Sequence, residues 1–182
     1  MKTYSLFDSQ RKKHACAIDG IRPHQLPPHE DVDAVLLVIE NALRRSVFAG
    51  YHTFKTSMTL GAELAAVEIL LRLRREFSHI RVHGYLPCET QANNWPNAWR
   101  ERYFNALARV DEVTYVSRRY HYGCTQATER LLLDQSGRLL GIYGAHVEQN
   151  PPYALTYAKK ANMDIVYVVA TMSIGQVDAF SS

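Results

Sequence analysis

Short apolar runs of strand length alternate with longer amphipathic segments along most of the chain, and this alternation constrains the fold more than any other feature. The apolar runs lie at 14–19, 51–55, 80–86, 113–116, 139–143 and 165–169. Segments with the apolar spacing of a helix lie between them, at 31–49, 60–77, 97–110, 125–133 and 153–161. Because parallel strands need crossover helices, this order predicts a three-layer α/β domain with a mostly parallel sheet and helices on both faces.

The size and composition fit one globular domain. The 182 residues are 47% hydrophobic, which suffices for one core. We predict a single domain over 14–172, with a polar lead-in at 1–13 and a tail at 173–182. No signal peptide and no apolar run of membrane-spanning length is visible, which predicts a cytoplasmic protein without a membrane partner. A net charge of +3 without a clustered basic face argues against nucleic acid as a partner.

The sequence indicates neither a metal site nor a bound cofactor. The cysteines Cys16, Cys88 and Cys124 are odd in number, far apart and without a CxxC pair. This pattern argues against a disulfide framework and fits a reducing compartment. His79 and His83 flank one predicted strand, but third and fourth ligands at suitable spacing are missing. We therefore predict no metal and no cofactor.

The loops that follow the predicted strands are where a ligand should bind, since ligands of open parallel sheets lie beyond the carboxyl ends of the strands. The turn at 56–61 leads into a predicted helix, and Ser57 and Thr59 could donate hydroxyl groups to a phosphate at the helix N-terminus. Simple N-capping by the same residues is the commoner alternative. Neither GxGxxG nor GxxxxGK[ST] is present.

Aromatic, basic and acidic side chains occur on the same side of the predicted sheet. Trp95 could stack on a base, although large aromatic rings usually pack against their own protein. Arg22 and Arg119 lie on such loops, and a guanidinium suits bidentate phosphate contact. Glu63 and Glu129 begin helices there and are candidates for general acid–base or nucleophilic chemistry. The alternative is that both acids only favour the helix dipole.

Several stretches of the chain match motifs that occur together in one group of α/β proteins. AIDGIRP and LGAELAAVEILL match at Gly20, Arg22, Pro23, Gly61, Glu63, Ala66 and Glu68. The most specific stretch, PCETQANNWPNAWRERYFNALARVDEV, matches at Pro87, Gln91, Trp95, Arg102, Tyr103 and Asp111. YHYGCTQATERLLLDQSGRLLGIY and the helix that follows it match at Tyr120, Gly123, Cys124, Asp134, Ser136, Thr156, Tyr157 and Ala158.

Through these motifs, residues from about 16 to 169 resemble the YpsA-like branch of the SLOG (SMF/DprA–LOG) superfamily, a Rossmann-like group. Three departures fall where that branch is expected to hold its ligand. Thr56 and Ser57 replace a glycine, Glu129 and Arg130 replace an Arg-Asn pair, and the segment 149–153 replaces a Gly-Gly-Thr phosphate loop. The prolines of that last segment lack an N–H, so it offers fewer donors to an anion.

The resemblance favours a protein that binds or senses a nucleotide derivative, such as a nucleoside phosphate or an ADP-ribose-like molecule. It would pass this state to a protein partner, and a homo-oligomer is also compatible. The expected ligand-binding residues are Gly20, Arg22, Pro23, Ser57, Thr59, Gly61, Glu63, Gln91, Trp95, Arg119, Tyr120 and Thr156.

Two alternatives stay open at this point. The first is an enzyme that cleaves or transfers an N-glycosidic bond, with Glu63 or Glu129 as nucleophile or general base. The PGGxGTxxE signature of the phosphoribohydrolases in the superfamily is absent from the chain, which counts against that activity. The second alternative is an interaction protein with a degenerate ligand site, which the two prolines at 151–152 favour.

Overall fold

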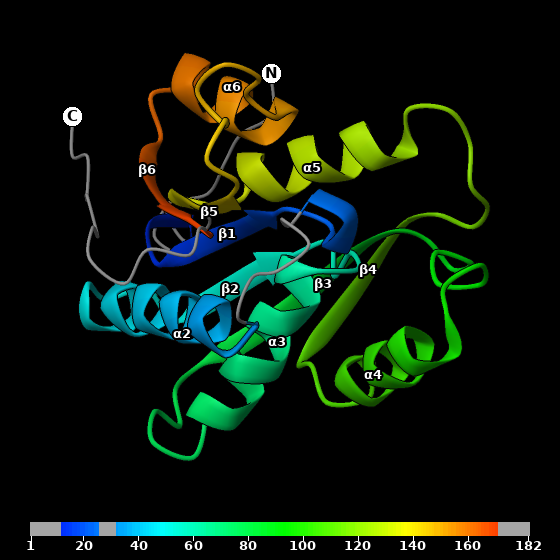
Figure 1. Cartoon of the computed structure of the whole chain (residues 1–182), viewed down its shortest axis with the longest axis horizontal. Coiled ribbons are helices and arrows are strands. Elements are labelled where there is room, and N and C mark those ends of the chain that lie inside the picture. Colours follow the sequence, from blue (N-terminus) through cyan, green and yellow to red (C-terminus); the bar gives the residue numbers. More distant parts are fainter. Residues whose placement is uncertain (1–11, 26–31, 171–182) are drawn as a thin grey trace.

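The chain folds around a single six-stranded sheet, seen in a computed structural model that describes residues 12–25 and 32–170 (Figure 1). All neighbouring strands are parallel, and their order is β4-β3-β2-β1-β5-β6. The strands are β1 (Ala15–Gly20), β2 (Thr53–Thr56), β3 (Arg81–Cys88), β4 (Glu112–Ser117), β5 (Arg138–Tyr143) and β6 (Asp164–Val169). The predicted alternation of strands and helices is confirmed.

Helices cover both faces of the sheet, as the sequence pattern predicts. They are α2 (Val32–Phe48), α3 (Ala62–Leu73), α4 (Asn97–Leu107), α5 (Cys124–Asp134) and α6 (Tyr153–Lys160), with a short 3-10 turn η1 (Pro23–Gln25) after β1. Figure 1 shows α2, α3 and α4 on one face and α5 and α6 on the other. No helix in the described part of the chain is long and apolar enough to cross a membrane.

The core is divided by the sheet into two clusters of buried side chains. The larger cluster lies under α2, α3 and α4, and Phe54, Leu64 and Leu86 within it are fully buried. The smaller cluster lies under α5 and α6 and includes Leu133 and Leu155. Helix α3 is buried on nearly all sides, which explains why its sequence is apolar almost throughout.

The order of the strands places a switch point beside β1. The chain moves outward from β1 through β2 and β3 to β4, and then returns to form β5 on the other side of β1. The helices after β1 and β5 consequently cover opposite faces, as Figure 1 shows. A crevice at the carboxyl ends of β1 and β5 is where ligands of such sheets bind.

Strand β3 continues past Pro87, where the sequence pattern had predicted its end. The pairing with β2 stops at Gly84, whereas the pairing with β4 continues to Cys88. Proline lacks the N–H that a central strand needs, but it is tolerated where one neighbour has already ended. The lead-in at 1–11 and the tail from 173 lie outside the described residues, so the predicted limits of the domain stay predictions.

Candidate functional site

The loops after β1 and β2 meet closely at the carboxyl edge of the sheet. The amide of Ala62 donates to the carbonyl oxygen of Ile21 at 3.0 Å. Gly61 has a φ of +115°, and a Cβ at this position would lie 2.5 Å from that same carbonyl oxygen. Gly20 faces α3 in the same way, because its Cβ would lie 2.8 Å from the Cβ of Ala62. The two motif glycines therefore allow the close approach that brings Arg22 beside the start of α3.

The turn at 56–61 is built around the buried carboxylate of Glu63. Thr56 and Ser57 donate their hydroxyl groups to Oε2 at 2.7 and 2.8 Å, and Thr59 donates to Oε1 at 2.7 Å. The Glu63 residue is only 4% exposed. The hydroxyl groups that we expected to bind phosphate thus already hold a carboxylate, and a phosphate role for Ser57 and Thr59 stays a prediction.

Gln91 fixes the same turn from the loop after β3. Its side-chain amide donates to the carbonyl oxygens of Ser57 and Met58 at 3.0 and 3.2 Å. Met58 has a φ of +53° and is fully buried, so these bonds stabilise a backbone conformation that is uncommon for a side-chain-bearing residue. The structure therefore assigns Gln91 a clear supporting contact, while its predicted contact with a ligand stays untested.

Two further carboxylates join Glu63 at this edge. Asp19 is the next-to-last residue of β1, and its Oδ2 accepts a hydrogen bond of 2.7 Å from the hydroxyl of Tyr143, which ends β5. Glu129 of α5 lines the same small cavity, of about 10 Å³, together with Asp19 and Glu63. We call Asp19, Glu63 and Glu129 the carboxylate cluster.

Asp19 and Tyr143 were missed by the sequence analysis. Each is the polar residue near or at the end of an apolar run, so the signal was present in the pattern of strand ends. Only the strand order shows that these two ends are neighbours. Glu129, which the sequence analysis proposed, does lie in the cluster.

Burial raises the pKa values of two of the three carboxylates well above the ordinary range of Asp and Glu. Burial raises the pKa of Asp19 to about 7, and the negative charge of Glu63 adds to this effect against the opposing hydrogen bond from Tyr143. Burial also raises the pKa of Glu129 to about 7, with the charges of Asp19 and Glu63 acting in the same direction. Both groups are therefore partly protonated near neutral pH, which suits a general acid or a hydrogen-bond donor.

Arg22 is exposed at the rim of the carboxylate cluster. Its backbone N–H is held by the side chain of Gln25 at 2.7 Å, inside the 3-10 turn. The positive charge of its guanidinium lowers the pKa of both Asp19 and Glu129, although less than burial raises them. Within residues 12–25 and 32–170, no hydrogen bond or ion pair of this guanidinium is found, so it is available to an anion at the rim.

The remaining predicted residues lie around this edge in different settings. Trp95 is half-buried and packs edge-on against Tyr103, with ring centroids 5.1 Å apart, so its predicted stacking on a base stays untested. Arg119 and Tyr120 are exposed on the loop between β4 and α5. Thr156 lies half-buried in α6, whose residue Ala154 lines the small cavity.

The departures from the family motifs also have a structural setting. The loop at 144–150 is followed by Pro151 and by Pro152, which precedes the first residue of α6 and makes no side-chain capping bond. This helix therefore begins without the backbone donor that a phosphate loop would supply at Pro152. No group of His, Cys, Asp and Glu side chains in the described residues is arranged to hold a metal ion, the carboxylate cluster included.

A parallel sheet with a polar cluster at its switch point defines a Rossmann-like α/β protein. The profile of the YspA SLOG family matches residues 16–177, which is most of the chain. The chain therefore belongs to the YspA SLOG family, and the resemblance inferred from its motifs is confirmed.

Proteins that are similar to this chain over most of its length occur in several bacteria. A UPF0398 protein of Shouchella clausii is 30% identical over 156 residues, covering 82% of this chain and 83% of the relative. A UPF0398 protein of Lysinibacillus sphaericus is 28% identical over 149 residues, covering 79% and 83%. One of Bacillus licheniformis is 27% identical over 164 residues, covering 87% and 90%. Their names state neither a ligand nor a reaction.

Proposed function

We propose that this chain binds a nucleotide derivative, a nucleoside phosphate or an ADP-ribose-like molecule, at the carboxyl edge of its sheet. Its bound state would then be read by a protein partner. The observation that carries the proposal is the placement of Asp19 and Glu129 beside the exposed guanidinium of Arg22 at the switch point. Sugar hydroxyl groups and a phosphate are the two chemistries that such a combination recognises.

The charges of the site set the orientation of the ligand. A phosphate next to three carboxylates would be repelled, so the phosphate belongs at the rim with Arg22, and the ribose belongs over the cluster. There its hydroxyl groups can donate to Asp19 and Glu129, since carboxylates are acceptors when ionised. The cavity of about 10 Å³ has room for about one water molecule, so the ligand lies across the rim rather than inside.

A thermal-shift screen tests this proposal with AMP, ADP-ribose and ribose 5-phosphate. A ligand that binds only the folded protein must raise its melting temperature. We expect the shift to be lost in Arg22→Ala and reduced in Asp19→Asn. Arg75→Ala is the matched control, because Arg75 is an exposed arginine in the loop beyond the far end of α3. A shift that is equal in all four proteins would overturn the site, and no shift with any ligand would favour the degenerate-site alternative.

Hydrolysis of an N-glycosidic bond is the second candidate, and the pKa values of about 7 for Asp19 and Glu129 favour it. A protonated carboxyl can donate a proton to the departing base, while an ionised neighbour activates water or stabilises positive charge on the sugar. Glu63 fits this role less well than Glu129, since its oxygens already accept three hydroxyl groups.

Chromatography of nucleoside monophosphates after incubation separates the two candidates. The enzyme hypothesis predicts that the wild type releases free base. It also predicts that Glu129→Gln no longer releases base but still binds the nucleotide. The binding reading predicts intact nucleotide in both samples. Glu101→Gln, at an exposed position of α4, serves as the control for an acid outside the cluster.

A further inference from the structure

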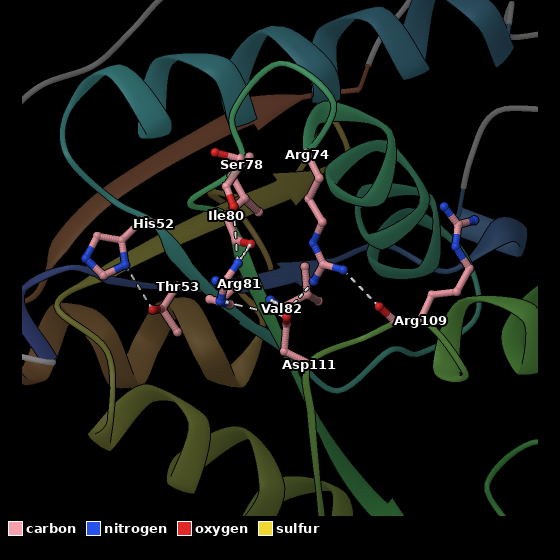
Figure 2. Close-up of polar contacts among 9 residues, drawn as sticks. All are labelled: His52, Thr53, Arg74, Ser78, Ile80, Arg81, Val82, Arg109 and Asp111. Atoms are coloured by element: carbon pink, nitrogen blue, oxygen red, sulfur yellow. Dashed lines mark hydrogen bonds and ion pairs between the residues drawn. The ribbon is translucent and has the colours of Figure 1, made fainter.

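A large hollow lies at the amino ends of the strands, opposite the site discussed so far. It has a volume of about 920 Å³ and lies between the starts of β2, β3 and β4 and the last turns of α5 and α6. Figure 2 shows part of its rim, where Arg81 and Val82 begin β3 and Asp111 precedes β4. A volume of this order is within the range of small-molecule sites. We call this hollow the amino-edge groove.

The floor of the amino-edge groove is the face of the sheet that carries Lys55, His83 and Tyr85. Side chains alternate along a strand, and the neighbours Phe54 and Val82 point into the larger core on the opposite face. The groove is therefore polar on its floor, although the reverse side of the same strands is the apolar core.

Lys55 is the central cation of this floor. Its ammonium group donates to the carbonyl oxygen of Gln135 at 2.9 Å and lies 5.6 Å from the centre of the Tyr85 ring. It forms no ion pair with any carboxylate of residues 12–25 and 32–170, although the side chain is half-buried. A half-buried ammonium without a counter-ion is stabilised by an anion that enters from solvent.

The acidic groups of the groove already have partners. Asp111 accepts hydrogen bonds from Arg74, which lies outside the groove, and from the amide of Val82. Asp134 accepts one from the hydroxyl of Tyr157. These contacts, visible for Asp111 in Figure 2, occupy two of the three acids that line the groove. The third, Glu112, is mostly exposed and lies 3.3 Å from His83, and its charge partly opposes the lowering of the Lys55 pKa by burial.

Two arginines on the walls of the groove are only loosely held by these acids. Arg81 lies 3.9 Å from Asp111, and Arg130 lies 3.9 Å from Asp134. Both side chains are more than half exposed. Arg81 also donates to the carbonyl oxygens of Ile80 and Ser78 at 3.1 and 3.2 Å, so it would exchange these bonds for a ligand, whereas the exposed Arg130 can turn toward one at little cost. With Lys12, which also lines the groove, Lys55, Arg81 and Arg130 place four cations around one space, against the three carboxylates of Asp111, Glu112 and Asp134.

We propose that the amino-edge groove is a second ligand site, which binds a small polyanion carrying phosphate or several carboxylate groups. Lys55 contacts the anion at the floor, and Arg81 and Arg130 contact it from the walls. The site is independent of the proposed nucleotide site, because the two lie at opposite ends of the strands.

Calorimetric titration with inorganic pyrophosphate and with citrate tests the second site. Neither probe contains ribose, so neither can contact the carboxylate cluster through sugar hydroxyl groups, and an Arg22→Ala variant tests whether a probe binds at the other edge. We expect binding of at least one probe to the wild type and a loss of about tenfold or more in Lys55→Met, since a charged hydrogen bond is removed. Lys55→Arg, which keeps the charge, should retain most of the affinity. The two probes distinguish phosphate from carboxylate chemistry.

The controls make the outcome independent of folding and of the other edge. Lys159→Met removes an exposed lysine of α6 and should bind as the wild type does. Loss of binding in Arg22→Ala would place the probe at the carboxyl edge and overturn the proposal. Melting temperatures of all variants show whether Lys55→Met is folded, and Arg130→Gln provides a second test if it is not. The proposal would be overturned if neither probe binds the wild type. It would also be overturned if Lys55→Met and Arg130→Gln both bind the probe with the affinity of the wild type.

Discussion

The carboxyl and amino ends of the same parallel strands differ in the charge of the side chains gathered there and in the volume of the cavity. At the carboxyl edge, three carboxylates surround a cavity of about 10 Å³, and glycines let the loops close on one another. At the amino edge, four cations and three carboxylates border a groove of about 920 Å³, with Lys55 on its floor. The contrast shows that one sheet can bury acids behind hydroxyl groups at one end and leave cations open to ligands at the other.

The largest effect should come from removing the acid that organises the carboxyl edge. Glu63→Ala leaves three hydroxyl groups, two of them on the buried residues Thr56 and Ser57, without their shared acceptor. We expect a loss of about 4 kcal/mol in the free energy of unfolding. Urea denaturation measures it. Glu101→Ala, at an exposed site, should stay within about 0.5 kcal/mol. A small loss for Glu63→Ala would show that the edge does not depend on this carboxylate.

The close approach of the loops at Gly61 should affect the free energy of unfolding almost as much. Gly61→Ala combines a positive φ with a contact of 2.5 Å to the carbonyl oxygen of Ile21, so we expect a loss of about 3 kcal/mol. Gly123→Ala is the matched control, since its φ is +85° but nothing lies within 4 Å of the added Cβ. We expect about 1 kcal/mol there, from the backbone alone. Equal losses of stability in Gly61→Ala and Gly123→Ala would show that the close approach of the loops is not the reason for a glycine at position 61.

The pH dependence of stability should follow the acids at the carboxyl edge between about pH 4 and 7. The folded state raises the pKa of Asp19 to about 7 from an ordinary value of about 4, so in this range it binds more protons than the unfolded state. The free energy of unfolding must then fall as the pH rises. Asp19→Asn should reduce that fall in denaturation curves recorded across the range. An unchanged slope would contradict the raised pKa.

The smallest effect should come from Lys55 at the amino edge, where the free energy of unfolding should rise rather than fall as the pH rises. Burial lowers the pKa of Lys55 to about 8, whereas the unfolded lysine keeps its proton to about pH 10. Between these values the unfolded state binds more protons, so this group makes the protein more stable as the pH rises. The stability difference between wild type and Lys55→Met should therefore change in favour of the wild type from pH 8 to 10. A flat difference would argue against a desolvated ammonium.

Much of the fold could be predicted because its signals are local. The six strands and five helices of the described chain coincide with predicted runs, within a few residues at each end. Strand β3 is the main exception at its end, because the tolerance of Pro87 depends on where β2 stops. That is a property of pairing between distant segments, which periodicity along the chain does not report.

The sequence by itself determined the alternation of strands and helices, the family, and the presence of Glu63 and Glu129 at the carboxyl edge of the sheet. Tertiary structure decided that the hydroxyl groups of Ser57 and Thr59 bond Glu63, and that Asp19 meets Tyr143 across 124 residues of sequence. It also decided that Lys55 lies on the floor of a groove. The physical reason is that spacing fixes which face a side chain occupies, whereas strand order fixes which faces and ends become neighbours.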